Sequence, residues 1–320
     1  MARPPRTLRT IAAFSCAIAA WLSTARCGGG NTNAPSVNLP PATGPVTGPT
    51  GSTGPIFGPE TFVGAGDIGY GGGGAADTAR LVSNISGQIF TAGDNAYPDG
   101  SADDFAKWYQ PTWGLCCLGR TRPVPGNHEY QRDPNAQAYF NYFGTLASPN
   151  GLPYYSYNVG AWHIVALNSM IDVSDAGPQG SWLKTDLATT DRKCLLAIWH
   201  YPLFTSGPDG SSPQMRDFWR ILYRAHAEII VNGHEHYYER FAPQNPEGGA
   251  DPAGIHEYIV GTGGAIQYPF VAIQPNSVAR IDHKYGVLKF ELKDGGWQSV
   301  FIDTSNTQYD FLPAQTCHAR

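Results

Sequence analysis

The sequence predicts an α/β fold, and two observations lead to this prediction. From about residue 60 onward, short apolar runs with strand-like composition alternate with amphipathic runs of helical period. Polar side chains follow several of the apolar runs, at the point where each run ends. Alternating strands and helices are typical of an α/β fold with a central sheet. We expect antiparallel strands to extend this sheet.

The first part of this region predicts three strands and one helix. TFVGAGDIG (61–69) is typical of a short buried strand that ends at a glycine-flanked aspartate, and ADTARLVSNI (76–85) is typical of a helix. QIFTAGDNAY (88–97) predicts a second strand with an aspartate at its end. RPVPGNHEY (122–130) predicts the end of a third strand, followed by a turn that its proline and glycine shape.

The second part continues the alternation. YYSYNVG and AWHIVALNS, together residues 154–169, predict an antiparallel pair with a turn between them. SWLKTDLATT (181–190) and DFWRILYRAHA (217–227) predict helices, and each is followed by an apolar strand, CLLAIWHYP (194–202) and EIIVNGHEH (228–236). Further strands are predicted over 256–265 and 285–302.

The N-terminal region differs in composition from the rest. Residues 1–26 combine basic MARPPRTLR, an apolar run and small residues before a cleavage point, which is typical of an export signal. Residues 27–58 are almost uncharged and rich in Gly, Pro and Thr, as in a flexible linker. We therefore expect one folded domain over 59–320 in a secreted or periplasmic protein. Cys27, followed by three glycines, leaves open a bacterial lipoprotein anchor, although the arginine before it departs from that pattern.

Charge and cysteine content narrow the classes of function. The formal net charge is −5, and removing the arginine-containing signal makes it more negative, which argues against nucleic acid as a partner. Four cysteines remain beyond residue 27, and disulfides are plausible after export. They allow three pairings, between which the sequence does not choose, although we expect no bond between adjacent Cys116 and Cys117. The other two are Cys194 and Cys317.

The polar residues at the predicted strand ends form a set of oxygen and nitrogen donors. These residues are Asp67, Asp94, Asn127, His200, His234 and His236. Taken singly, each has an ordinary interpretation, such as a turn aspartate, a helix cap or a hydrogen-bonded histidine. Together they would converge beyond the carboxyl ends of the strands, where open α/β sheets bind ligands.

The composition of this set indicates two metal ions. Carboxylate, amide and imidazole donors without thiolate suit Fe, Zn or Mn. Six ligands exceed the need of one catalytic metal, whereas two metals can clamp a phosphoryl group and activate a water. In a strand, His234 and His236 would face one side and Glu235 the other. His128 would point away from Asn127, towards a substrate.

At this point the residues resemble a known family. Five segments, in order, resemble the motif blocks of the metallophosphoesterase (calcineurin-like) superfamily, in its purple acid phosphatase-like branch. They are GDIG (66–69), GDNAY (93–97), GNHE (126–129), the histidine of AIWH (197–200) and GHEH (233–236). The resemblance extends from about residue 60 to residue 312, and it implies a four-layer sandwich of two mixed β-sheets flanked by helices.

The resemblance also implies a division of the ligands. Asp67, Asp94, Tyr97 and His236 would hold the first metal, Fe(III) in the family, and the Tyr97 phenolate would give the purple colour. Asp94 would bridge to the second metal, which is Fe, Zn or Mn and is also held by Asn127, His200 and His234. Asn127 and His128 would bind substrate, with His128 as the catalytic group. A buried core tyrosine is the alternative interpretation of Tyr97.

One departure from the family pattern concerns proton transfer. Plant members carry further histidines after the fourth block, whereas here the matching segment YPLFTSGPDGSSPQM (201–215) has none. Proton donation would then depend on His128 or on water, and an acidic pH optimum is not implied.

The sequence therefore predicts an exported binuclear phosphoesterase that hydrolyses small phosphate monoesters by attack of a metal-bound hydroxide. Two alternatives stay open: a phosphodiesterase acting on nucleotides or phospholipid head groups, and a secreted binding protein that has lost catalysis. The oligomeric state is not predicted.

Overall fold

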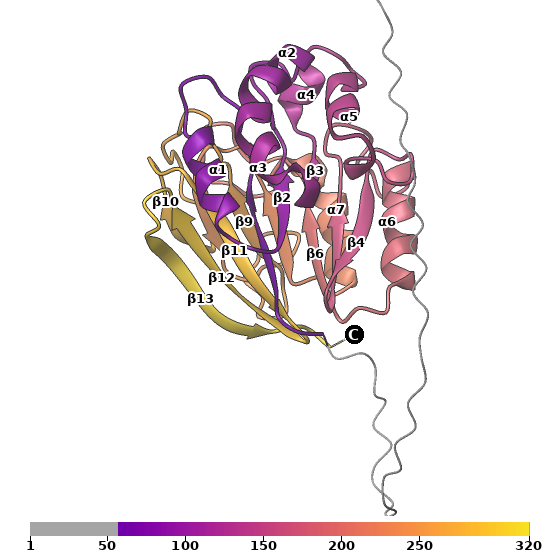
Figure 1. Cartoon of the computed structure of the whole chain (residues 1–320). Coiled ribbons are helices and arrows are strands. Elements are labelled where there is room, and N and C mark those ends of the chain that lie inside the picture. Colours follow the sequence, from indigo (N-terminus) through magenta and orange to yellow (C-terminus); the bar gives the residue numbers. More distant parts are fainter. Residues whose placement is uncertain (1–56, 320) are drawn as a thin grey trace, which may run out of the picture. The chain divides into compact units, whose positions relative to one another are not determined.

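The first of two sheets joins the first strand of the described residues to the last three. In the computed structural model, which describes residues 57–319, β1 pairs in parallel with β2 and antiparallel with β11 (Figure 1). The yellow C-terminal strands thus lie beside the indigo N-terminal strand. In spatial order the strands are β13 (Gln308–Thr316), β12 (Gly296–Asp303), β11 (Gly286–Lys293), β1 (Glu60–Ala65), β2 (Gln88–Ala92) and β3 (Thr121–Val124).

The second sheet is also mixed, with a parallel centre and antiparallel edges. In spatial order its strands are β10 (Ser277–Ile281), β8 (Tyr238–Phe241), β9 (His256–Val260), β7 (Ile229–Asn232), β6 (Cys194–Ile198), β5 (Trp162–Ala166) and β4 (Tyr155–Val159). The antiparallel β4–β5 pair agrees with the prediction for residues 154–169.

Helices flank the sheets. They are α1 (Ala75–Ser83), α2 (Ala102–Asp104), α3 (Leu115–Cys117), α4 (Asn127–Gln131), α5 (Gln137–Phe143), α6 (Pro178–Thr189) and α7 (Arg216–Arg224). A π-helix, Phe105–Gly114, and three short 3₁₀ turns complete the elements of residues 57–319. Two mixed sheets with flanking helices confirm the predicted α/β class and the predicted layers.

Strand β6 shows why its sequence is apolar on both faces. Leu196 and Ile198 belong to the core between the sheets, whereas Leu195 and Ala197 pack with the inner faces of α6 and α7. Every residue of this strand is buried. A central parallel strand covered on both faces requires such a continuous apolar run, and the next residues after it, Trp199 and His200, lead into the site.

The cysteine pairing corrects one prediction. Cys116 and Cys117 are bonded to each other, with their Cα atoms 3.7 Å apart, so the expectation that these neighbours stay unbonded is wrong. The pair lies where α3 ends, and Cys117 leaves the helical conformation with φ −139°, which changes the direction of its side chain. The second bond joins Cys194 of β6 to Cys317, just beyond β13, and so links the two sheets.

The predictions for the N-terminal region are not addressed by this fold. The export signal over 1–26 and Cys27 lie outside the described residues, as does the linker over 27–58 except for its last two residues. Within residues 57–319, none of the helices combines the length and apolar character needed to cross a bilayer.

Candidate metal centre

The turns after β1 and β2 hold two aspartates in an unusual backbone conformation. Asp67 and Asp94 have φ values of 59° and 49°, in the left-handed region that few non-glycine residues adopt. Neighbouring glycines leave room for the close approach of other loops. A Cβ at Gly93 would lie 2.5 Å from His200 Nδ1, and one at Gly126 would lie 2.2 Å from Asp94 Oδ1. The Gly-Asp sequences therefore serve to place carboxylates, and they are not ordinary turns.

One group of donors surrounds the Tyr97 hydroxyl. This oxygen lies 2.8 Å from Asp67 Oδ1, 3.0 Å from Asp94 Oδ2 and 3.1 Å from His236 Nε2. His236 Nε2 also lies 3.3 Å from Asp67 Oδ1. Both carboxylates and both rings are buried. Four donor atoms from three different loops thus converge on one point.

A second group lies on the other side of Asp94. His200 Nε2 is 3.2 Å from Asp94 Oδ2 and 3.0 Å from Asn127 Oδ1. The ring of His234 is 5.1 Å from that of His200. One donor atom from each of Asp67, Asp94 and His200 lies within 4.8 Å of the others. Asp94 Oδ2 therefore lies between the two groups, and all seven residues predicted as ligands meet at this centre.

The local structure of the two last histidines differs from the prediction. Strand β7 ends at Asn232, so the segment 234–236 is an irregular turn, and His234 has φ 73°. The turn forms because Asp67 Oδ2 accepts a hydrogen bond from the His234 amide, at 2.9 Å. The His236 ring nevertheless reaches the Tyr97 hydroxyl and the His234 ring lies beside that of His200, while Glu235 turns away and accepts from the Asp209 and Gly210 amides.

The orientation of the imidazoles fits metal ligands. The Nδ1 atoms of His200 and His236 lie 2.8 Å and 2.6 Å from the carbonyl oxygens of Ala92 and Ile266. These carbonyls can only accept, so each Nδ1 carries a proton and each Nε2 faces the centre. Metal-bound histidines typically donate their second nitrogen in this way. The donor set of carboxylate, amide, phenol and imidazole accordingly fits the two metal ions that the sequence predicts.

The electrostatics of the centre indicate a place for cations. Burial raises the pKa of Asp94, but the charges of His200 and His128 outweigh burial and hold it well below its usual range. Burial and the charges of Asp67 and Asp94 raise the pKa of Tyr97 far above its ordinary value. A tyrosinate at this position therefore needs a cation. In the described residues the two carboxylates form ion pairs with histidines only.

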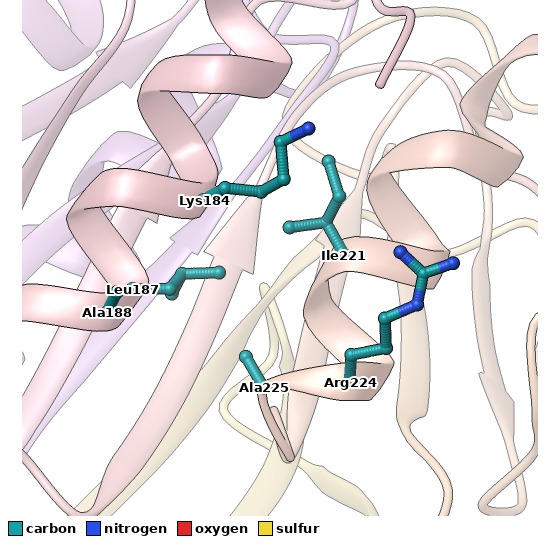
Figure 2. Close-up of a pocket in the computed structure, with 6 residues that line it drawn as sticks. All are labelled: Lys184, Leu187, Ala188, Ile221, Arg224 and Ala225. Carbon is teal, nitrogen blue, oxygen red and sulfur yellow. The ribbon is translucent and has the colours of Figure 1, made fainter. Parts of the chain in front are cut away.

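A separate hollow of about 270 Å³ lies between α6 and α7 (Figure 2). Its floor is apolar, and the Lys184 and Arg224 side chains extend beside it from the two helices. No carboxylate or imidazole lines it, so it offers no hydrolytic chemistry. The lining residues are Lys184, Leu187, Ala188, Ile221, Arg224 and Ala225.

The profile of the calcineurin-like phosphoesterases matches residues 61–238, a span that contains all the donors described above. The chain belongs to this phosphoesterase family. Two relatives from Arabidopsis thaliana are purple acid phosphatases. Purple acid phosphatase 15 is 29% identical over 250 residues (66% of this chain, 47% of the relative), and purple acid phosphatase 21 is 31% identical over 235 residues (64% and 50%). The chain spans about half the length of these relatives.

A solved phosphoesterase structure has the same fold. The purple acid phosphatase from yellow lupin seeds superposes with a TM-score of 0.71, at 20% identity, over 80% of this chain and 53% of that one. The purple acid phosphatase-like branch predicted from the motifs is thus confirmed by the relatives.

His128 occupies a distinct position in this phosphoesterase centre. Its side chain is 27% exposed, whereas that of His200 is fully buried. Its Nδ1 bonds to the Pro98 carbonyl, and its Nε2 lies 3.7 Å from Asp94 Oδ2. The following residue, Glu129, accepts from the Asn95, Ala96 and Gly126 amides and fixes both motif turns. His128 therefore keeps Nε2 near Asp94 while part of its ring remains accessible to solvent.

Two aromatic residues that contact the histidines of the centre were not predicted from the sequence. The Tyr201 ring lies 4.5 Å from that of His234, and the Tyr268 ring stacks on His236 at 4.0 Å. No motif marks either tyrosine. A partial signal was the glycine-rich segment GTGG (261–264), because a Cβ at Gly261 would lie 2.8 Å from Asp67 Oδ2. Such a run after a strand indicates a close backbone approach, which brings the following loop to the centre.

Proposed function

We propose that this phosphoesterase-family chain is an exported two-metal hydrolase of phosphate monoesters. The observation that carries the proposal is the position of Asp94 Oδ2, 3.0 Å from the Tyr97 hydroxyl and 3.2 Å from His200 Nε2. A carboxylate between two donor groups can bridge two cations, as binuclear phosphoesterases require.

The proposed ligands form two sets around this bridge. Asp67, Asp94, Tyr97 and His236 would hold Fe(III), and Asp94, Asn127, His200 and His234 would hold Fe, Zn or Mn. Such a pair of cations lowers the pKa of water and withdraws charge from a phosphoryl group. A phenol beside two carboxylates suits the more highly charged ion, because Tyr97 needs strong compensation to lose its proton.

The chain's own residues would position the substrate and move the proton. The Asn127 side chain offers its amide to a phosphoryl oxygen as well as its carbonyl oxygen to the centre. His128 is partly exposed, and its Nδ1 bonds to the Pro98 carbonyl. Its Nε2 is then the nitrogen that exchanges a proton with the leaving alcohol or neutralises a phosphoryl oxygen.

Export is part of the proposal. The first 26 residues have the order of an export signal. Two disulfides among the described residues are in keeping with an oxidising compartment. The protein would be secreted or periplasmic, and lipid attachment at Cys27 would hold it at a membrane.

The test combines metal analysis with turnover of two substrates on protein purified without chelator. We expect about two metals per chain including iron, a broad visible band, and faster hydrolysis of 4-nitrophenyl phosphate than of bis(4-nitrophenyl) phosphate. Faster turnover of the diester would make the chain a phosphodiesterase. Full metal occupancy without hydrolysis of either ester would indicate a binding protein.

A further inference from the structure

An apolar loop lies beside the metal centre, between β9 and β10. Residues 258–279 contain no Asp, Glu, Lys, Arg or His. Within this stretch Ile266, Val271 and Ile273 are 56%, 64% and 55% exposed. Exposed large hydrophobic side chains are few in the described residues, and three of them fall within eight positions of this loop. Exposed apolar side chains that gather on one loop make that loop a candidate binding surface.

The loop is attached directly to one of the donor histidines. The Ile266 carbonyl accepts from His236 Nδ1 at 2.6 Å, and the Tyr268 amide donates to the His236 carbonyl at 3.1 Å. The Tyr268 ring lies nearly parallel to that of His236, with an angle of 16° between the planes. A substrate phosphoryl group at the centre would therefore have its alcohol part within reach of this loop.

Hydrogen bonds to Ser206 and a ring contact with Tyr237 also hold this loop in place. The Val271 and Ala272 amides donate to the Ser206 carbonyl at 2.8 and 3.2 Å, and the Gln274 amide donates to Ser206 Oγ at 3.0 Å. Phe270 packs on Tyr237, with ring centroids 4.3 Å apart. These contacts fix the backbone while leaving the apolar side chains outside, so the surface is formed before a ligand binds.

An acidic residue, Asp209, also lies close to the turn that carries His234 and His236. Asp209 is exposed, and its amide donates to Glu235 Oε1 at 3.1 Å, which fixes the loop that carries it. Glu235 stands between His234 and His236 in the sequence, so this hydrogen bond holds Asp209 beside the turn that carries both histidines. From there the Asp209 carboxylate would repel a second anionic group of a substrate.

We propose that loop 266–273 binds the alcohol part of the substrate, and that Asp209 excludes alcohols with a further negative charge. The substrate class is then phosphate monoesters of apolar alcohols. The inference rests on the proposed hydrolytic function and specifies its substrate.

The test compares kcat/KM of the metal-loaded full chain for three esters. We expect kcat/KM for octyl phosphate to exceed that for glycerol 2-phosphate by at least about tenfold, and fructose 1,6-bisphosphate to be the poorest substrate.

The variant Ile266→Asn/Ile273→Asn should raise KM for octyl phosphate about tenfold with kcat unchanged, because both side chains are exposed and touch no reacting atom. Phe311→Asn, at a 59% exposed position of β13, is the matched control and should change nothing. Asp209→Asn should raise kcat/KM for the bisphosphate alone.

Three results would overturn the proposal. They are equal efficiency for octyl and glycerol esters, an equal loss in the Phe311→Asn control, and a loop variant that lowers binding to phospholipid vesicles without changing KM. The last would make the loop a membrane contact. Calorimetric binding of octylphosphonate and methylphosphonate separates this inference from the proposed function. Tighter binding of octylphosphonate by a chain that hydrolyses no ester would uphold the loop's role and reject the hydrolytic one.

Discussion

Two groups of buried carboxylates in this fold differ in what binds them. Asp67 and Asp94 each accept one backbone amide, and the other oxygen of each faces a phenol and imidazoles at the metal centre. Glu235, Glu239 and Glu257 face mainly backbone amides of the loop 203–210, which they fasten to the second sheet. Burial is nearly complete in both groups, so burial does not distinguish them.

The partners explain the difference. The amides that bond to Glu235, Glu239 and Glu257 tie a loop to these carboxylates, which therefore stabilise the loop. Asp94 Oδ2 instead faces the Tyr97 hydroxyl and His200 Nε2, so its lone pairs are directed at the point where other donor atoms converge. The second arrangement is the one that a cation completes. Loop 203–210, which the glutamates hold in place, contains no histidine. This loop is therefore rigid and offers no imidazole as a proton donor.

The largest expected effect comes from removing the bridge between the two donor groups. Asp94→Asn should lower kcat/KM by at least about 10³-fold, because the amide cannot bridge two cations. Metal content by mass spectrometry should fall with it. The control Asp303→Asn changes a buried carboxylate bound by the Ser305 and Thr307 amides, and it should retain both metals. Substantial activity in Asp94→Asn would contradict the two-metal proposal.

The second prediction concerns the phenol of the centre. Tyr97→Phe should abolish the visible band and weaken iron binding about 10–100-fold, a range typical of a weakened metal site. Absorption spectra and competitive chelation measure these two effects. Tyr258→Phe, at a buried tyrosine that bonds to Ser299, should leave the spectrum unchanged. A band that persists in Tyr97→Phe would remove Tyr97 from the ligand set.

A smaller effect is expected in the glutamate group. Glu239 accepts from the Ser206 amide at 3.0 Å and from the Ser206 and Ser277 hydroxyls. Glu239→Gln should lower the free energy of unfolding by about 1.5–3 kcal/mol, the range for hydrogen bonds to a charged group. Denaturant titration measures this, and metal content should not change. Exposed Glu247→Gln is the matched control. Loss of a metal in Glu239→Gln would erase the distinction between the two groups.

The smallest expected effect is a pH dependence. Burial, then the charge of Asp209, raises the pKa of Glu235 to about 7 from 4.5. The folded chain therefore holds this proton more tightly than the unfolded chain, and the associated stability is present below pH 4.5 and lost as pH rises through 7. The wild-type protein should lose stability between pH 4.5 and pH 8. In Glu235→Gln this loss in the free energy of unfolding should be smaller by about 1–3 kcal/mol. Parallel stability curves for both proteins would show that Glu235 does not titrate in this range.

Strand β6 was predictable because it forms a continuous apolar run, and the edge strand β4 because its pairing with β5 follows from a turn between two strand-like runs. The edge strands β10 and β13 were not predicted, because each mixes polar and apolar residues and has no fully buried residue. The donors were predictable because each follows a strand. The turn at His234 was not, since it depends on Asp67 from a distant loop. Tyr268 was missed for the same reason, because only the folded chain brings it to His236.

The bond between Cys194 and Cys317 has a mechanical consequence. It joins residues 123 positions apart, and the segment between them contains β6 to β13 and contributes strands to both sheets. A force applied to the two ends of the chain cannot extend this segment while the bond is intact. In single-molecule pulling, reduction of the bond should add about 400 Å of extension, at roughly 3.3–3.6 Å per residue. The half of the fold that carries His200, His234 and His236 is thus shielded from tension along the chain.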